Sequence, residues 1–408
     1  MTKNTGPLSD IRVLDLTRIL AGPTGTQVLG DLGADVIKIE RPHEGDDTRK
    51  WGPPFLKDRN GEDMGESSYF LAANRNKRSL SIDIAKPEGQ ALIRELLADC
   101  DVLVENFKVG GLEKYGLSYD QLQDEFPGLI YCSITGFGQT GPYAPRPGYD
   151  YLVQGIGGIM SLTGEPEGEP MKVGVGISDI VCGMNAMIAV LAALHDRDKT
   201  GLGQWIDMSL LDSQVAWLVN EGMNFLLSDK LPRRLGNAHA NIVPYQLFPT
   251  SDGHVIIAVG NDSQFHRFCE FAGLDACGDD PRFATNPARL ENRDALVALI
   301  KEATQQRTMH EWLAGLEAAG VPCAPVNDLR QVFEDPQVIS RAMRITMDNP
   351  AAEGGEVELI GSPIKMSRTP VSYRRAPPRL GEHTDEILSS ELQLDADRIR
   401  KLREMGVI

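Results

Sequence analysis

Residues 11–42 read IRVLDLTRILAGPTGTQVLGDLGADVIKIERP, and this stretch decides the fold. It begins with a short apolar strand at residues 11–16 and passes through a Gly-Pro turn into an amphipathic segment that ends at Gly33. A second apolar strand follows at residues 36–39. Two parallel strands joined through a helix form a βαβ unit, which is the building block of a doubly wound sheet. The stretch therefore predicts an α/β fold.

The same alternation of strand and helix continues along the next hundred residues. Apolar, strand-like runs alternate with amphipathic runs, one of which has Pro87 near its start, where proline favours a helix beginning. The predicted order is strand 77–84, helix 87–100, strand 101–107, helix 119–129 and strand 130–138. Two further helices around a short strand are predicted between residues 174 and 218.

After residue 225 the sequence changes character and predicts a second domain. Two strand-like runs meet across Ser251-Asp252-Gly253, which indicates a hairpin. A later helix is opened by Thr308 with Glu311 three residues on, a capping box, and is closed by Gly320. We expect a smaller α+β domain over residues 225–330, then more strands and a last helix over 395–406.

Composition narrows the class of protein. The 408-residue chain has a formal net charge of −17, which argues against a surface built to attract nucleic acid or acidic lipid. Its six cysteines are scattered and form no zinc-like cluster with histidine, as is typical of a reducing compartment. The first residues lack the apolar core of a signal peptide, and no run of eighteen apolar residues occurs. We expect a cytoplasmic protein without metal, membrane or nucleic-acid partners.

Basic residues gather where the predicted strands end. Arg41 follows the second strand, and Lys108 and Lys114 follow the strand over 101–107. Ligands of doubly wound sheets bind outside the carboxyl ends of the strands, so these cations could form one rim that binds a phosphorylated ligand. The alternative is that they are ordinary solvated surface residues.

Asp179 is the single acidic residue in GVGISDIVCGM, residues 174–184. The simplest interpretation makes Asp179, or Ser178, the N-cap of the helix that follows. A functional interpretation uses the same geometry, because a helix N-terminus would hold a carboxylate ionised and oriented, as a carboxylate nucleophile requires. The two interpretations are compatible.

Other chemistry is poorly supported by the sequence. The glycines of LAGPTGTQVLG do not have the spacing G-x-G-x-x-G, which disfavours an NAD-dependent dehydrogenase and leaves a tight turn as the simpler explanation. No histidines have metal-ligand spacing, and no nucleophile elbow or phosphate-binding loop is present. His239 and His383 lie in predicted loops, where either could contact a substrate or be solvated.

Several stretches together resemble the class III coenzyme A transferases, the CaiB/BaiF-like family that includes formyl-CoA, carnitine and bile-acid CoA transferases and related acyl-CoA racemases. The matching text, in order and over nearly the full length, is VLDLTRILAGPTGTQVLGDLGADVIKIERP, NRNKRSLSIDI, DVLVENFKVGGLEKYGL, SITGFGQTGPY, GISDIVCGM, TGLGQWIDMSLLD and GEHTDEIL. The resemblance implies a Rossmann-like, doubly wound large domain built from both chain ends, residues 1–210 and 335–408, with the smaller domain between them. It also implies an interlocked homodimer.

The resemblance assigns roles to particular residues. The family's catalytic aspartate falls on Asp179. The residues at the family's CoA-binding positions are Leu20, Ala21, Arg41, Ala73, Arg75, Asn106, Phe107, Lys114 and Tyr115. Trp51, Phe137, Gln139, Tyr149 and His239 would line the substrate site. Arg41 and Lys114 are the expected partners of the CoA phosphates.

The implied chemistry needs no resident cofactor, because CoA and acyl-CoA are substrates. Asp179 would attack the acyl-CoA thioester to give a mixed aspartyl anhydride and CoA thiolate, and the acyl and CoA groups would then be exchanged onto an acceptor carboxylate. A carboxylate needs no base to deprotonate it, which agrees with the absence of a Ser-His or Cys-His pattern nearby. Glycine amides in GFGQTG and QGIGG could stabilise the tetrahedral oxyanion.

Two departures from the family's patterns refine the expected activity. Racemases carry GHD where this sequence has GYD, so Tyr149 replaces their proton-transferring histidine and transfer is favoured over racemisation. Oxalate-specific members carry a glycine run where this sequence reads RLGNAHANIVPYQ, which puts oxalate in doubt. The sequence is more similar to the branch that moves CoA between dicarboxylic acids such as succinate and hydroxymethylglutarate. Arg49, Arg75 and His239 are candidates for binding the acceptor's far carboxylate.

Two alternatives stay open at this stage. One is an acyl-CoA racemase or isomerase of the same superfamily, which would act without an acceptor acid. The other is a non-catalytic CoA-binding protein, which would keep Arg41 and Lys114 but would not need Asp179.

Overall fold

Six parallel strands form the central sheet in the computed structural model, which describes residues 5–408. Their order is β5-β2-β1-β6-β7-β8, and each neighbouring pair runs parallel. The strands are β1 (Arg12–Asp15), β2 (Asp35–Glu40), β5 (Lys77–Ser81), β6 (Val102–Glu105), β7 (Ile130–Thr135) and β8 (Trp205–Ser209). The prediction of an α/β fold with a parallel sheet is confirmed. The order of strands reverses between β1 and β6, where sheets of this kind bind ligands beyond the carboxyl ends.

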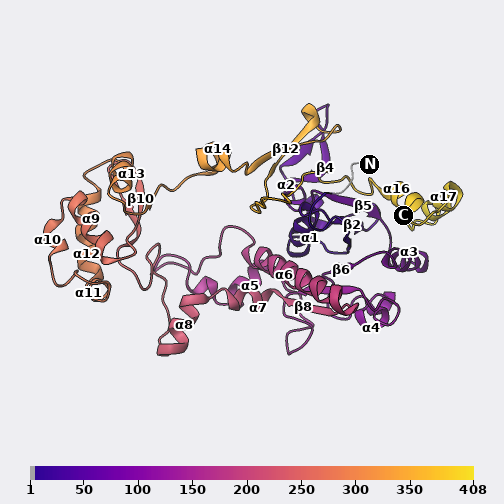
Figure 1. Ribbon diagram of the computed structural model, residues 1–408, viewed down its shortest axis with the longest axis horizontal. Helices are drawn as coiled ribbons and strands as arrows, with labels where there is room; N and C mark the ends of the chain where they lie inside the picture. Colours follow the sequence, from indigo (N-terminus) through magenta and orange to yellow (C-terminus); the bar gives the residue numbers. More distant parts are fainter. Residues whose placement is uncertain (1–4) are drawn as a thin grey trace. The chain divides into compact units, whose positions relative to one another are not determined.

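Alternate side chains of the strands enter two different cores. Leu14 of β1 packs in a core with residues of α3 (Pro87–Leu97), α16 (Thr384–Ser390) and α17 (Ala396–Glu404). Val13 packs in another core with residues of α1 (Ala21–Asp31) and α6 (Ile177–Thr200). The sheet is therefore covered on both faces, and the C-terminal helices lie near α3, as Figure 1 shows. Because both faces of the sheet are buried, the side chains on both sides of each strand are mostly apolar, and the strands appear in the sequence as continuous apolar runs.

Helix α6 packs tightly against α1 because Gly183 has no side chain. A Cβ atom at Gly183 would lie 2.3 Å from the carbonyl oxygen of Ala21, so only glycine permits this approach. The sequence indicated no long apolar run, but α6 is the one helix, among residues 5–408, long and apolar enough to cross a membrane by length and composition. Its buried residues include Cys182, Ala186 and Met187, which belong to the same core as Val13.

The chain divides into two units. The first comprises the described residues up to Gly158 together with Val173–Trp217 and Gln337–Ile408, and the second comprises Ile159–Lys172 and Leu218–Pro336. Besides the central sheet, α1, α3, α6, α16 and α17, the first unit contains η1 (Asp47–Lys50), β3 (Phe55–Lys57), β4 (Asp63–Ser67), α2 (Ser68–Ala72), η2 (Glu113–Tyr115), α4 (Tyr119–Leu122), α5 (Asp150–Ile156), α7 (Leu210–Ala216), β12 (Arg344–Asp348), η4 (Glu353–Gly355) and β13 (Glu356–Ile360). Helix α15 (Pro336–Ser340) begins at the last residue of the second unit.

The second unit is built on an antiparallel sheet of order β11-β10-β9. The predicted hairpin is confirmed, since β9 (Tyr245–Pro249) pairs antiparallel with β10 (His254–Ala258). The capping box is also confirmed, because Thr308 and Glu311 bond each other's backbone at the start of α13. The other elements are η3 (Ile159–Ser161), α8 (Val219–Ser228), α9 (Asp262–Ala272), α10 (Asp275–Gly278), α11 (Asn286–Glu291), α12 (Arg293–Thr304), α13 (Met309–Ala318), β11 (Cys323–Ala324) and α14 (Leu329–Glu334).

One predicted helix is much shorter than expected. The helix predicted over 119–129 forms only as α4, which ends at Leu122. Pro127 prevents a regular helix from continuing to residue 129, because proline has no backbone N–H and disfavours helical conformation in the residue before it. The last predicted helix forms as α17, with Asp395 as its N-cap.

A buried ion network supports the loops at the carboxyl edge of the sheet. Asp15 at the end of β1 accepts hydrogen bonds from Lys77 Nζ at 3.0 Å and from Thr26 Oγ1 at 2.6 Å. Lys38 Nζ bonds Asp46 at 2.9 Å and the carbonyl oxygen of Thr17 at 2.8 Å. Burial alone would raise the pKa of Asp15, but the two ammonium groups and the hydroxyls lower it to about 2. The network is therefore charged at neutral pH.

The network predicts a large loss of stability when one cation is removed. Replacing Lys77 with Met leaves Asp15 buried with less compensating charge, so we expect the free energy of unfolding to fall by about 3–5 kcal/mol. Urea unfolding followed by circular dichroism measures this, with Lys401→Met on the exposed side of α17 as control. A loss for Lys77→Met no larger than for the control would contradict the charged network.

Candidate active site

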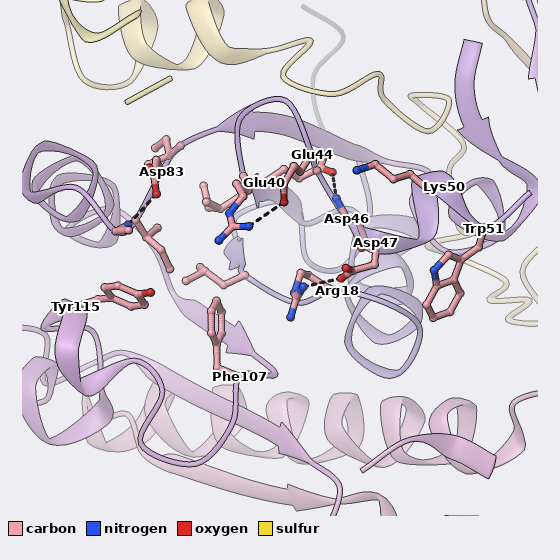
Figure 2. Close-up of a pocket in the computed structure, with 17 residues that line it drawn as sticks. Arg18, Glu40, Glu44, Asp46, Asp47, Lys50, Trp51, Asp83, Phe107 and Tyr115 are labelled. Atoms are coloured by element: carbon pink, nitrogen blue, oxygen red, sulfur yellow. Dashed lines mark hydrogen bonds and ion pairs between the residues drawn. The ribbon is translucent and has the colours of Figure 1, made fainter. Parts of the chain in front are cut away.

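Two adjoining pockets lie at the carboxyl edge of the sheet in the first unit. The first, of about 350 Å³, is bordered by residues that follow β1, β2, β5 and β6, and Figure 2 shows its lining. The second, of about 380 Å³, is bordered by residues that follow β1, β6, β7 and β8. Arg18, Phe107 and Tyr115 line both pockets. The two pockets therefore flank the point where the strand order reverses, where a long ligand could pass from one to the other.

The loop after β1, which lies between the pockets, is held by hydrogen bonds from the segment after β6 and from the segment after β2. Asn106 clamps Arg18, since its Oδ1 accepts from the Arg18 backbone N–H at 3.0 Å and its Nδ2 donates to the Arg18 carbonyl at 2.7 Å. The Arg18 guanidinium pairs with Asp47 at 2.6 Å, as Figure 2 shows. Asp46 Oδ1 accepts from the backbone N–H of Ile19, which ties the same loop to the buried network. The crevice between β1 and β6 is thus pre-formed.

Asp179 lies in the first turn of α6 and lines the second pocket. Its prediction as the N-cap is wrong, and so is the alternative of Ser178. The N-cap position is Gly176, which has no side chain, and the amides are bonded by the carboxylate of Asp150 instead. Asp150 Oδ1 accepts from the backbone N–H of Ser178 at 2.8 Å and from that of Asp179 at 3.4 Å. The carboxyl group of Asp179 is consequently left available to the pocket.

Gln154 and Gln214 fix this capping arrangement. Gln154 Nε2 donates to Asp150 Oδ2 at 2.7 Å, and its Oε1 accepts from the backbone N–H of Val173 at 2.8 Å. Ser178 Oγ bonds Gln214 Oε1 at 2.8 Å, which ties the first turn of α6 to α7. Both glutamines are buried, so these bonds are shielded from water.

The environment of Asp179 makes its carboxylate basic. Burial raises its pKa first, the negative charge of Asp150 raises it further, and the result is about 7. The sequence led to the expectation that the helix N-terminus holds this group ionised, and the structure adds burial and a like charge, both of which favour its protonated form. A carboxylate of higher pKa is a stronger nucleophile when it is deprotonated.

Tyr69 is a further residue near these carboxylates that the sequence did not single out. Burial and then the negative charges of Asp179 and Asp150 raise the pKa of Tyr69, which places its phenol within electrostatic reach of both. Its ring meets that of Trp51 edge to face, with centroids 5.1 Å apart. The sequence carried no pattern that marks such a tyrosine.

The structure brings most of the predicted residues together, but not all. Those that line the second pocket are Leu20, Ala21, Asn106, Phe107, Lys114, Tyr115, Tyr149 and Asp179. Arg41 and Trp51 line the first pocket with Phe107 and Tyr115. Ala73, Arg75, Phe137 and Gln139 line neither, and His239 belongs to the second unit.

Two arginines proposed for substrate binding are already neutralised. Arg75 is buried and donates to both carboxylate oxygens of Asp31, at 2.9 and 2.6 Å. Arg49 is buried and grips Glu40 in the same bidentate manner, at 2.8 and 2.7 Å. Their role in the structure is to hold parts of the first unit together, and they leave no unpaired charge for a substrate.

The remaining predicted residues have structural contacts of their own. Phe137 packs edge to face on Tyr143, and the backbone N–H of Gln139 donates to the carboxylate of Asp207. His239 Nδ1 accepts from the backbone N–H of Asn241, and its ring lies against Tyr245. Residues 5–408 contain no group of three or more histidine, cysteine or acidic side chains arranged to hold a metal ion.

Fold and site together indicate an α/β enzyme, with two pockets at the switch point of its sheet and a buried carboxylate in one of them. The chain belongs to CoA-transferase family III, whose profile matches residues 8–384. The family resemblance noted in the sequence is thereby confirmed.

Individual relatives are similar over almost the whole chain. A succinate–glutarate CoA-transferase of Agrobacterium fabrum is 49% identical, covering 95% of this chain and 96% of the relative. The human succinyl-CoA:glutarate CoA-transferase is 42% identical, covering 99% of this chain and 90% of the relative. The crystal structure of a CaiB/BaiF family protein from Brucella suis superposes with a TM-score of 0.83 at 49% identity, covering 96% of this chain and all of that one.

The capping carboxylate gives a testable pH dependence. A carboxylate nucleophile must be ionised, so with Asp179 in that role we expect kcat/KM for transfer to rise with pH through a midpoint near its pKa of about 7. In Asp150→Asn the amide oxygen can still accept the backbone hydrogen bonds, but the like charge is gone. We therefore expect the midpoint to move to lower pH. Coinciding profiles of wild type and variant would contradict the influence of Asp150 on Asp179.

Proposed function

We propose that the protein moves CoA from an acyl-CoA donor such as succinyl-CoA to a dicarboxylic acid through a mixed anhydride on Asp179. The observation that carries the proposal is the buried, basic carboxylate of Asp179 in a pocket that also contains Lys108 and Lys114. The names of the relatives, which act on succinyl-CoA or succinate and glutarate, support a dicarboxylate as acceptor. CoA is a substrate here, and the proposal needs no resident cofactor.

The first step forms the anhydride. A carboxylate oxygen of Asp179 attacks the thioester carbon, the C–S bond breaks, and the sulfur leaves with the bonding electrons as CoA thiolate. The negative oxygen of the tetrahedral intermediate needs aligned donors, each worth about 3–4 kcal/mol in comparable sites. Backbone amides of the glycine-containing loop at Gly136 and Gly148, which both line the pocket, are candidates.

The later steps return the enzyme to its starting state. The acceptor's carboxylate attacks the Asp179 carbonyl carbon and expels the donor acid, so that the anhydride now carries the acceptor. The thiolate then attacks the acceptor's carbonyl carbon, which forms the new thioester and releases Asp179 as a carboxylate. Each step exchanges one acyl bond for another, so the energy of the thioester is conserved without hydrolysis.

The CoA moiety is proposed to run through both pockets. Arg41 in the first pocket and Lys114 in the second supply positive charge for phosphates, and Phe107 and Tyr115 at their junction offer apolar contact. Arg41 currently pairs with Glu44 at 2.8 Å on the surface, where an exposed ion pair costs little to break. The thioester would then reach Asp179 at the end of this path.

A racemase is the second candidate, and Tyr149 disfavours it. Tyr149 lines the same pocket as Asp179, but its phenol is a hydrogen-bond donor and cannot replace an imidazole that exchanges protons at neutral pH. A racemase would turn over a chiral 2-methylacyl-CoA in the absence of any acceptor acid, and the proposal expects no such turnover.

We also propose an interlocked homodimer that resides in the cytoplasm. Exposed apolar side chains support a partner surface, since α8 has no buried residue and exposes Leu226 and Leu227. The six cysteines are all free thiols, which suits a reducing compartment. Light scattering on the purified protein tests the dimer, and a monomer at micromolar concentration would contradict it.

The nucleophile is tested by Asp179→Ala with a chemical trap. Wild type incubated with succinyl-CoA and hydroxylamine should form a hydroxamate on the peptide that contains Asp179, because the activated carbonyl reacts with the amine. Asp179→Ala should lose transfer by at least about 10³-fold while still binding CoA. Asp397→Asn on the exposed surface of α17 is the control. Unchanged transfer by Asp179→Ala would overturn the mechanism.

A further inference from the structure

The Arg146 guanidinium is an unneutralised cation in the pocket of Asp179. It lies in the loop between β7 and α5 and stacks over the ring of Tyr143, 3.9 Å from the ring centroid. That ring is in turn braced edge to face by Phe137 at 5.7 Å. No carboxylate among residues 5–408 lies within salt-bridge distance of Arg146, in contrast to Arg18 in the same pocket, which pairs with Asp47. Its charge is thus oriented by an aromatic face and open to a ligand.

Apart from Arg18, which Asp47 neutralises, the cations of the second pocket fall into two groups. Lys108 and Lys114 belong to the segment after β6, together with Phe107 and Tyr115, which also line the first pocket. Arg146 lines the same pocket but belongs to the segment that leads to Tyr149, which has no residue in the first pocket. We expect a CoA chain that enters through the first pocket to follow Phe107 and Tyr115 to the lysine segment, which leaves Arg146 for the acyl group.

The contact between Asp150 and Asp179 limits how far Arg146 can lie from Asp179. Asp150, only four residues after Arg146, contacts the backbone of Asp179 directly. Four residues span at most about 14 Å even when fully extended, and an arginine side chain shortens the gap to a bound acid. Because both residues line the second pocket, we expect a substrate attached to Asp179 by one end to reach Arg146 with its other end.

We propose that Arg146 binds the far carboxylate of the dicarboxylic substrate and so makes the enzyme selective for dicarboxylic over monocarboxylic acids. The inference rests on the proposed reaction at Asp179. A guanidinium can hold a carboxylate by two parallel hydrogen bonds, which a lysine cannot reproduce. A monocarboxylic acid of equal length leaves this charge without a partner, and selectivity follows from that difference.

The other candidates for this role are less suited. Arg49 and Arg75 are each bound by a buried carboxylate, so a substrate would have to displace an ion pair from the interior. His239 Nδ1 already accepts a hydrogen bond from the backbone N–H of Asn241. Arg146 needs no such rearrangement.

The test compares glutarate with valerate as acceptors, since the two acids differ only in the second carboxylate. Succinyl-CoA is the donor, and the variants are Arg146→Met, which removes the charge, and Arg146→Lys, which keeps the charge but removes the planar fork. Arg398→Met, on the exposed side of α17, is the control. The readouts are kcat/KM for each acceptor and the inhibition constant of free CoA.

We expect Arg146→Met to lower kcat/KM for glutarate by about 30–100-fold and Arg146→Lys by about 10-fold, with valerate changed less than about 2-fold. The inhibition constant of CoA should stay the same. An equal loss for both acceptors, or weaker inhibition by CoA in Arg146→Met, would overturn the proposal and indicate that Arg146 binds a CoA phosphate. Failure of the anhydride mechanism is seen separately, because Asp179→Ala would then retain transfer to glutarate.

Discussion

The carboxylate of Asp150 bonds the first amides of α6, and the availability of Asp179 depends on this bond. An aspartate near a helix start ordinarily turns back to cap its own backbone. Here Asp150 occupies that role from another helix, so the Asp179 carboxyl group faces the pocket. The same contact places two carboxylates close together and out of water, which raises the pKa of Asp179. One interaction therefore both leaves the Asp179 carboxyl group facing the pocket and raises its pKa.

A second set of buried polar contacts positions the loops that form the two pockets. Asp15, Lys77, Lys38 and Asp46 form an ion network that supports the loop containing Arg18, and Asn106 holds the same loop from β6. Each charge in the network would be costly alone, and each is stabilised only because its partner is present. The pockets are thus built before a ligand binds, which lowers the free-energy cost of ordering a long substrate.

Sequence reasoning found the fold because the local signals agree with the global topology. The βαβ pattern of residues 11–42, the hairpin turn at Ser251–Gly253 and the capping box at Thr308 each depend on neighbours in the chain, and each formed as expected. The family motifs pointed to Asp179 and to residues that line the two pockets.

What sequence could not supply were pairings between distant segments. Nothing in the residues around Asp179 says that Asp150, 29 positions away, takes over the cap. In the sequence Arg49 and Arg75 looked like free cations, because their ion-pair partners, Glu40 and Asp31, become their neighbours only in the folded chain. Arg146 went unnoticed for the opposite reason, since its lack of a carboxylate partner is visible only once neighbouring loops are in place.

The central claim is that Asp179 becomes covalently attached to the acyl group in every cycle, and an isotope measurement tests it most directly. When the acceptor dicarboxylate is labelled with ¹⁸O in its carboxylates, release of Asp179 from the anhydride leaves one acceptor oxygen on its side chain. After many turnovers with succinyl-CoA, mass spectrometry should find ¹⁸O in the peptide that contains Asp179 and none in peptides that contain other acidic residues. An unlabelled Asp179 in enzyme that has turned over would contradict the account.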